Sequence, residues 1–313
     1  MMQILLLLGG FVLLIFGGNA LLKSSVSISL KLSIPKIIVG MTVVSFATSL
    51  PELVVSLKAA LSGNPDLALG NVVGSNAANI GLVLGVTLLF GAMNVTSSFY
   101  KINWPVMMTA TLLLLGFLYF DGILSRIEGV VLVVAMISFL WWLLRMQSEP
   151  AVVDELPEDD ELLSIPLTLF YLVAGGVGLW LGSEWLIKAA VNIAEDLGVS
   201  DRVIGITVVS IGTSIPELAA SIIAIVKKEK AISLGNLIGS NIFNIMSVLG
   251  ITAIVSPIKV IDQGFITNDL FFMTFISFIL FPLVFAPNRM KLCWKEGLVL
   301  LAIYAAFVYK VIL

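Results

Sequence analysis

The sequence predicts an all-α polytopic membrane protein with ten transmembrane helices, arranged as two inverted-topology repeats of five helices each. Three observations predict this fold. Of the 313 residues, 59% are hydrophobic and 12% are charged, whereas soluble domains carry roughly 25% charged residues. Apolar stretches of about 20 residues, each long enough to cross a bilayer as a helix, recur along nearly the whole chain. An alignment of the chain with itself at an offset of 165 residues relates its two halves.

Ten apolar stretches make the predicted transmembrane helices. The first lies at the amino terminus and could be mistaken for a signal peptide. Lys23 follows its apolar run and no basic segment precedes it, so a retained helix is expected. The predicted spans are 2–22 (with an optional extension to about 32), 36–61, 66–91, 101–120, 123–145, 165–188 (with an optional extension to 197), 201–226, 231–256, 264–286 and 295–313.

The repeat indicates how the two halves are oriented. Residues 40–87 align with residues 205–252 without a gap, and half of the aligned positions are identical. The same offset aligns the first and sixth predicted helices, so the repeat comprises a whole half of about five helices. Because five is odd, the second half must enter the membrane in the opposite orientation, as in many secondary transporters with substrate sites near the midplane. A duplicated scaffold without a transport role is the alternative, and it does not explain why polar residues are retained.

Charge placement predicts the boundaries and the topology. The repeats are expected at residues 1–146 and 165–313, joined by the acidic segment 147–164, which has two prolines and no periodic apolar pattern. This segment is expected to be a solvated linker. A calcium-sensing segment is the alternative, but the glycine and ligand spacing of an EF-hand is missing. Eleven of the 17 Lys and Arg residues fall on the predicted face that holds the linker, so this face should be cytoplasmic and both termini outside.

A glutamate lies inside an apolar run in each half, within the sequences ATSLPEL and GTSIPEL. In the first copy, Thr48 and Glu52 are four residues apart and therefore share one helix face. Pro51 cannot donate a backbone hydrogen bond, and its ring would clash with the carbonyl group of Ala47. The helix should break there and free carbonyl oxygens beside the glutamate. Thr213, Pro216 and Glu217 repeat the arrangement.

A second motif follows each glutamate, as GNVVGSNAANI in the first half and GNLIGSNIFNI in the second. Ser75 and Asn79 lie four residues apart in the first copy, as do Ser240 and Asn244 in the second. The glycines permit either a helix break or a close helix approach. Small-residue packing between membrane helices is the alternative explanation for the glycines, but it does not explain the asparagines and the serine that each copy retains.

The two motifs together predict a site for hard cations. A carboxylate at the bilayer centre costs at least about 2.5–3.5 kcal/mol on insertion scales, so such residues usually serve a function. Two carboxylates with hydroxyl, amide and carbonyl oxygens suit Ca²⁺, which takes six to eight oxygen ligands. Two negative charges balance one Ca²⁺ or two Na⁺ ions. The chain has no histidine and a single cysteine, so softer transition metals would find few suitable ligands.

The paired motifs closely resemble the two α-repeats of the prokaryotic type of sodium/calcium exchanger, within the cation/calcium exchanger superfamily. The resemblance implies ten helices in two inverted halves, with the ion site between the second, third, seventh and eighth helices. It also implies that Na⁺ and Ca²⁺ share this site and that sliding of the first and sixth helices alternates access. An antiporter of Na⁺ and Ca²⁺ in a cell inner membrane is therefore expected, without a cofactor, a nucleic acid or an obligatory protein partner.

Site residues follow from the resemblance when the motifs are matched position by position. The acidic ligands are Glu52 and Glu217, and the supporting residues are Thr48, Ser49, Ser75 and Asn79 on one side and Ser210, Thr213, Ser214, Ser240 and Asn244 on the other. Two positions depart from the pattern. Ala47 stands where the second copy has Gly212, which could make the first break stiffer. Some relatives carry Asp at the position of Asn244, so K⁺ co-transport is less expected here.

Other functions remain open at this point. A proton-coupled antiporter of Ca²⁺ or another cation is the main alternative, with Glu52 and Glu217 carrying protons. Proton-coupled relatives tend to carry an acid in the second motif, where this chain has Asn79 and Asn244, so sodium is favoured. A channel or a passive membrane protein would not require inverted halves with paired carboxylates. An enzyme is not expected, because no nucleophile with its base, phosphate loop or cofactor motif is present.

Overall fold

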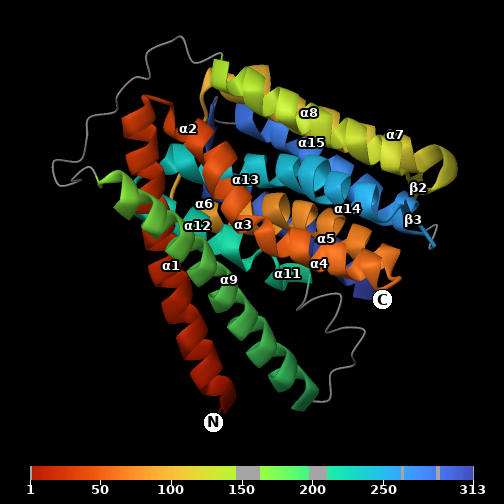
Figure 1. Ribbon diagram of the computed structural model, residues 1–313, viewed down its shortest axis with the longest axis horizontal. Coiled ribbons are helices and arrows are strands. Elements are labelled where there is room, and N and C mark those ends of the chain that lie inside the picture. The colour runs from red at the N-terminus through yellow and green to blue at the C-terminus, as the bar shows by residue number, and fades with distance from the viewer. Residues whose placement is uncertain (1, 146–162, 197–209, 262–263, 287–289, 313) are drawn as a thin grey trace.

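The computed structural model describes residues 2–145, 163–196, 210–261, 264–286 and 290–312. The described residues form helices, joined by short turns, and two small sheets of two strands each (Figure 1). Most of the predicted linker, residues 147–164, lies outside these ranges, as does the start of the predicted span 201–226. A fold built almost entirely of helices is therefore confirmed for the described part of the chain.

Several helices of the first half are interrupted by π-helical segments, labelled η. The first half contains α1 (Met2–Leu32), α2 (Lys36–Val39), η1 (Gly40–Val44), α3 (Ser45–Thr48), α4 (Leu50–Leu61), α5 (Pro65–Ala78), η2 (Asn79–Leu84), α6 (Gly85–Phe90), β1 (Met93–Asn94), η3 (Phe99–Asn103), α7 (Trp104–Asp121), β2 (Ile123–Leu124) and α8 (Arg126–Arg145).

The second half repeats this order of elements where it is described. It contains α9 (Ile165–Asp196), α11 (Ser210–Gly212), α12 (Ile215–Val226), α13 (Lys230–Phe243), η5 (Asn244–Leu249), α14 (Gly250–Val255), β3 (Ile258–Lys259), η6 (Phe265–Leu270), α15 (Phe271–Phe285), β4 (Lys291–Leu292) and α16 (Trp294–Ile312). The π-helical segments η2 and η5 are separated by the same 165 residues as the sequence motifs in which they begin.

The described helices account for most of the predicted spans. Seven of them are long and apolar enough to cross a membrane, and an eighth is obtained if Lys36–Thr48 and Leu50–Leu61, bent by 44° at their junction, form one span. The remaining predicted spans correspond to α12, which is short but apolar, and to α16, which carries three charged residues. The number ten thus stays a prediction.

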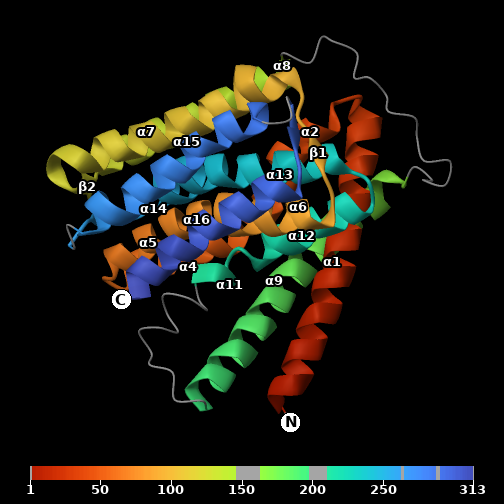
Figure 2. The same ribbon diagram turned by 180° about the vertical axis from the view of Figure 1, so that it is seen from behind.

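Two long helices, α1 and α9, pack side by side and cross the remaining helices steeply (Figures 1 and 2). Glycines allow their backbones to approach closely. A Cβ atom on Gly175 would lie 2.6 Å from the nitrogen of Leu21, and one on Gly10 would lie 2.9 Å from the carbonyl oxygen of Gly182. Without glycine at these positions the two helices would have to separate.

The centre of the molecule is formed by α5 and α13, each continuing through a π-helical segment. In both of the spans Pro65–Phe90 and Lys230–Val255, 78% of the most apolar window is buried, against 22–39% in the other five single spans. Gly235 and Gly239 of α13 let η1 pack directly on that helix, because a Cβ atom at either position would meet the backbone around Met41. In the second half the second-motif glycines therefore serve close helix approach, and α13 runs through them without a break.

Each small sheet joins the two halves. Strand β1 pairs antiparallel with β4, and β2 pairs antiparallel with β3. Strands β1 and β3 are related by the repeat offset, since Met93 corresponds to Ile258. Figure 2 shows β1 and β2 at opposite ends of the bundle, as expected if the two halves have opposite orientations.

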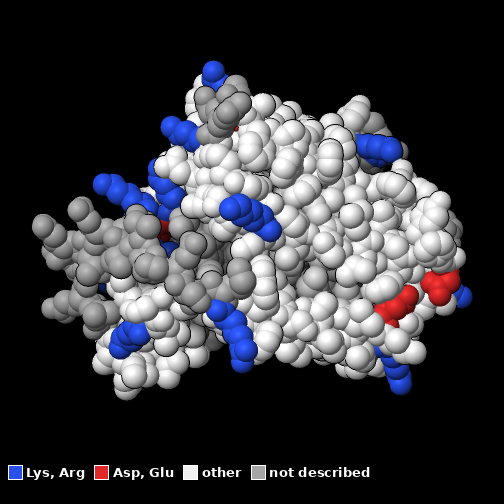
Figure 3. Space-filling model, turned by 90° about the horizontal axis from the view of Figure 1, so that it is seen from above, with Lys and Arg blue, Asp and Glu red and all other residues white. Residues whose placement is uncertain are grey.

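The outer surface is suited to lipid. Large apolar side chains face outward on many helices, for example Phe16 on α1, Phe120 on α7 and Ile127 on α8, which are 73%, 88% and 78% exposed. Figure 3 shows a broad uncharged surface, with charged side chains mostly toward its two ends. An apolar belt of this extent marks a membrane-facing surface.

Candidate ion-binding site

Both glutamates of the repeated motif lie where a helix is broken. Helix α3 ends at Thr48 and α4 starts at Leu50, and the intervening Ser49 has φ −87° and ψ 2°. Ser214 has φ −87° and ψ 3° at the same point between α11 and α12. In each case the proline lies in the first turn of the following helix, where its missing N–H is not needed. The predicted proline-associated breaks are therefore present, and their local backbone conformations are the same.

The carboxyl groups of Glu52 and Glu217 are fully buried and mostly without partners. Both side chains are 0% exposed. Among the described residues, neither carboxylate oxygen of Glu52 has a hydrogen-bond partner, and Oε2 of Glu217 also has none. Oε1 of Glu217 accepts a hydrogen bond from Ser49 Oγ of the other half at 3.4 Å. Buried carboxylates are costly unless they are paired, coordinate a metal or are protonated, so these two groups can hold cations or protons.

The hydroxyl of Thr48 connects the first broken helix to the second motif of the other half. Thr48 Oγ1 lies 3.2 Å from Asn236 Oδ1 and 3.3 Å from Ser240 Oγ. One turn earlier, Ser45 Oγ donates to the carbonyl oxygen of Asn236 at 3.0 Å. These contacts hold α3 against α13, so the first motif of one half meets the second motif of the other.

The two π-helical segments of the central helices begin at Asn79 and Asn244. Single π-helical turns are rare and often occur at functional sites. Each of these amides uses its nitrogen for packing: Asn79 Nδ2 donates to Asn241 Oδ1 at 3.3 Å, and Asn244 Nδ2 donates to Asn76 Oδ1 at 3.0 Å and to Ser75 Oγ at 3.2 Å. The oxygen of each amide is buried and has no partner among the described residues.

Six unpartnered oxygens belong to the predicted site residues. The described part of the chain has eight buried side-chain N and O atoms without a hydrogen-bond partner, and six of them are Glu52 Oε1, Glu52 Oε2, Asn79 Oδ1, Ser214 Oγ, Glu217 Oε2 and Asn244 Oδ1. Helix α4, which carries Glu52, packs against η5, and α12, which carries Glu217, packs against η2. An oxygen set of this number and charge matches what Ca²⁺ requires.

The structure brings most of the predicted site residues to this centre. Ser75 accepts from Asn244, and Ser240 contacts Thr48. Ser214 is buried and its hydroxyl is one of the six unpartnered oxygens. Thr213 is buried. The side chain of Ser210 lies outside the part of the chain that the structure describes.

Sequence reasoning assigned no role to Asn76 and Asn241, which orient the predicted ligands. Asn76 Nδ2 donates to the carbonyl oxygen of Asn241 at 3.1 Å, while the two side chains hold Asn244 and Asn79 through the hydrogen bonds described above. Asn76 and Asn241 occupy equivalent positions in the repeat alignment, so the sequence did mark them as retained polar residues. Motif spacing alone could not show that these amides hold other amides.

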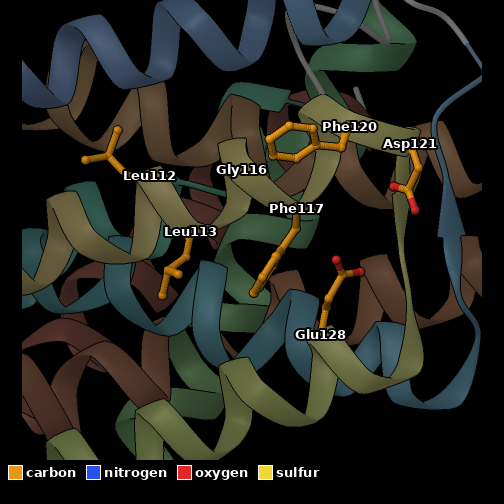
Figure 4. Close-up of a pocket in the computed structure, with 7 residues that line it drawn as sticks. All are labelled: Leu112, Leu113, Gly116, Phe117, Phe120, Asp121 and Glu128. Carbon is orange, nitrogen blue, oxygen red and sulfur yellow. The ribbon is translucent and has the colours of Figure 1, made fainter.

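One open cavity is separate from this centre. It measures about 320 Å³ and is lined by Leu112, Leu113, Gly116, Phe117, Phe120, Asp121 and Glu128 on α7 and α8 (Figure 4). Its two carboxylates serve local turns: Asp121 Oδ1 accepts from the N–H of Ile123 at 3.0 Å, and Glu128 Oε2 accepts from the N–H of Ser125 at 2.7 Å. None of the predicted ion ligands lines it.

Replacing Asn241 by Ala should reduce transport about tenfold and destabilise the protein by about 1–3 kcal/mol. The change removes the acceptor for Asn79 Nδ2, and a buried donor left unpaired costs roughly that amount. It also lets the Asn79 oxygen turn away from the site. Ion uptake in proteoliposomes and thermal unfolding measure the two effects. Asn268→Ala, the same change at an exposed asparagine, should alter neither; equal effects of both variants would contradict the orienting role of Asn241.

Comparison with known proteins gives a consistent result. A model of the family described as sodium/calcium exchanger protein matches residues 2–145 and 167–313. The chain is 36% identical to CaxA of Alkalimonas amylolytica, over 96% of this chain and 95% of that protein. It is 30% identical to the sodium/calcium exchanger MaX1 of Methanosarcina acetivorans, over 97% and 96%. A solved structure of the sodium-calcium exchanger NCX_Mj has a TM-score of 0.83 with 28% identity, covering 99% of this chain and 98% of that one.

Proposed function

Because this chain belongs to the sodium/calcium exchanger family, we propose that it exchanges Na⁺ for Ca²⁺ across the membrane at the centre formed by Glu52 and Glu217. The protein is a membrane transporter of the antiporter type and not an enzyme. The observation that carries the proposal is the set of six buried, unpartnered oxygens contributed by the two halves. A buried carboxylate set of this kind is costly unless cations or protons balance its charge.

We propose the following ion ligands at this centre. Glu52 and Glu217 supply the charge, and Asn79, Asn244 and Ser214 supply neutral oxygens. Thr48, Ser49, Thr213, Ser75, Ser210 and Ser240 complete the proposed set, either directly or by fixing the breaks. Two carboxylates balance one Ca²⁺ or two Na⁺ ions, so the two cations compete for the same charges. This competition is what an exchanger requires, since one ion must leave before the other is carried back.

Alternating access at this centre requires the two halves to have opposite orientations. We assign residues 1–146 and 165–313 to two inverted five-helix repeats, joined by the cytoplasmic segment 147–164, with both termini outside the inner membrane. Two observations support this assignment. The two antiparallel sheets, each with one strand from either half, lie at opposite ends of the bundle. The π-helical segments recur at the repeat offset. Helices α1 and α9, which pack on each other and cross the other helices, are the pair proposed to move.

The related proteins support the choice of ions. MaX1 is named as a sodium/calcium exchanger, and structures of the sodium-calcium exchanger NCX_Mj include crystals soaked with Na⁺ and Ca²⁺ and with Na⁺ and Sr²⁺. YrbG of Escherichia coli, 34% identical over 93% of this chain and 89% of that protein, is named as an inner membrane protein. These names support Na⁺ and Ca²⁺ as substrates and the inner membrane as the location.

The test is radiocalcium uptake into proteoliposomes loaded with Na⁺ and diluted into buffer with or without Na⁺ at fixed pH. We expect uptake only when an outward Na⁺ gradient is present. Uptake that ignores Na⁺ and follows a pH gradient would overturn sodium coupling and make the protein a proton-coupled antiporter, with the same two glutamates carrying protons. Uptake without any counter-ion gradient would overturn exchange itself.

A further inference from the structure

Pro216 leaves a backbone carbonyl group without its helical donor beside the ion centre. In a continuous α-helix the carbonyl oxygen of Gly212 would accept from the N–H of residue 216, and proline has no N–H. Gly212 is buried and is the last residue of α11, directly before Thr213 and Ser214. A buried carbonyl group needs a hydrogen-bond partner from elsewhere.

That partner comes from α9. Ser183 Oγ donates to the carbonyl oxygen of Gly212 at 2.8 Å, and the Ser183 side chain is 3% exposed. A serine within a helix more often bonds to a carbonyl of its own preceding turn, as Ser24 and Ser25 of α1 both do with Leu21. The hydroxyl of Ser183 instead bonds across to a different helix.

Close packing at the same point explains why residue 212 is glycine. A Cβ atom on Gly212 would collide with the side chain of Ile187, which lies one turn beyond Ser183 on α9. The difference between Gly212 and Ala47 therefore reflects the position of α9. The local bend does not require it, since Ser49 and Ser214 have nearly the same backbone angles.

The other half lacks this contact. At the repeat offset Ser183 corresponds to Gly18, and Gly212 corresponds to Ala47. Pro51 frees the carbonyl oxygen of Ala47 in the same way, but Gly18 has no side chain that could donate to it. Only one of the two freed carbonyl groups can therefore be capped by a side chain from this position of α1 or α9.

We propose that Ser183 is a positioning residue that ties the placement of α9 to the broken helix of the ion site, and thereby biases the protein toward one of its two access states. The inference rests on the proposed exchange by movement of α1 and α9. When α9 moves along α11 and α12, this hydrogen bond must break, and the carbonyl oxygen of Gly212 must find water or an ion. The bond thus stabilises the arrangement seen here relative to the one that faces the other side.

The test uses membrane vesicles of both orientations and measures the half-saturating Ca²⁺ concentration on each side of the protein. Loss of one hydrogen bond changes an equilibrium constant by roughly fivefold. The apparent dissociation constant on each side equals the intrinsic constant divided by the fraction of protein open to that side. Ser183→Ala should therefore raise the half-saturating concentration on one side and lower it on the other, by up to about fivefold. Ser183→Thr, which retains the hydroxyl, should restore wild-type values. Should the Ala variant fail to accumulate, Ser183→Cys replaces it, because a thiol is a weak donor.

Ser27→Ala is the matched control. It removes the hydroxyl that lies 3.0 Å from Thr168 Oγ1 and joins α1 to α9. Because these two helices are proposed to move together, this contact is the same in both access states. The half-saturating concentrations should therefore not change. A lower maximal rate for Ser183→Ala with unchanged values on both sides would overturn the proposal and leave Ser183 a packing residue. If Glu217→Gln still abolishes transport in the same vesicles, that result leaves the proposed function intact. Wild-type vesicles without Na⁺-dependent uptake would instead overturn the proposed function.

Discussion

Replacing Glu217 by Gln should abolish Na⁺-driven Ca²⁺ uptake, with a loss of more than about 100-fold, while the protein still folds. The change removes one of the two carboxylates at the proposed centre. An interaction between unit charges about 4 Å apart is worth roughly 4 kcal/mol at an effective dielectric constant of 20, and a divalent ion loses more than this. Glu52→Gln should behave in the same way. Uptake into Na⁺-loaded proteoliposomes measures the effect.

Thermal unfolding separates a lost site from a lost fold. Without Ca²⁺, Glu217→Gln should unfold at or above the wild-type temperature, because the variant no longer buries a carboxylate oxygen that lacks a partner. With Ca²⁺, only the wild type should gain stability, since a ligand stabilises the state that binds it. Glu128→Gln makes the same change at a carboxylate that caps α8 and should transport normally. Wild-type uptake by Glu217→Gln would remove this residue from the site.

The sequence carried more information about the site than about the helices around it. Pro51 and Pro216 predicted breaks beside the glutamates, because proline acts locally and does not depend on tertiary packing. The repeat alignment marked the polar residues that both halves retain, and the resemblance to sodium/calcium exchangers implied that they share one ion site. The breaks and the retained residues needed only residue types and a constant offset.

Other features depend on contacts between distant segments. The π-helical turns at Asn79 and Asn244 occur where the central helices pack against each other, and no residue type marks such a turn in advance. The roles of Asn76 and Asn241 appear only when the halves are placed together. Ser183 gave no signal in the sequence, because its partner Gly212 lies on another helix and the equivalent residue, Gly18, differs.

The hydrogen bonds of Asn79 and Asn244 fit the role of ion ligand that we propose for them. An amide has a donor and an acceptor end, and at Asn79 and Asn244 the donor end is fixed by the opposite half. The amide oxygen is then free to bind a cation, and it does so without adding a further negative charge to the site. Exchange between ions of different charge requires such a balance, since a site with too much negative charge would not release Ca²⁺.

Replacing Asn244 by Asp should therefore make Ca²⁺ uptake depend on monovalent cations. We expect uptake to differ by at least about tenfold with and without them. The variant has three carboxylates, so one Ca²⁺ no longer balances the charge, and a further monovalent cation should be needed for full loading. An ionised Asp also cannot donate to Asn76 Oδ1, which now accepts from Asn244, and a cation between the two oxygens would relieve the conflict. Ca²⁺ uptake measured with K⁺, Na⁺ or choline present should show strong monovalent activation in the variant only.

Asn244→Leu provides the contrast, because it removes the oxygen without adding charge. It should weaken Ca²⁺ uptake about tenfold and create no monovalent activation, since one of six available oxygens is lost and the charge is unchanged. Opposite outcomes for Asp and Leu would show that the Asn244 oxygen contacts the ion. An unchanged ion profile in Asn244→Asp would mean that residue 244 faces away from the bound ion, and the two glutamates would then have to select ions with the hydroxyl groups and Asn79 alone.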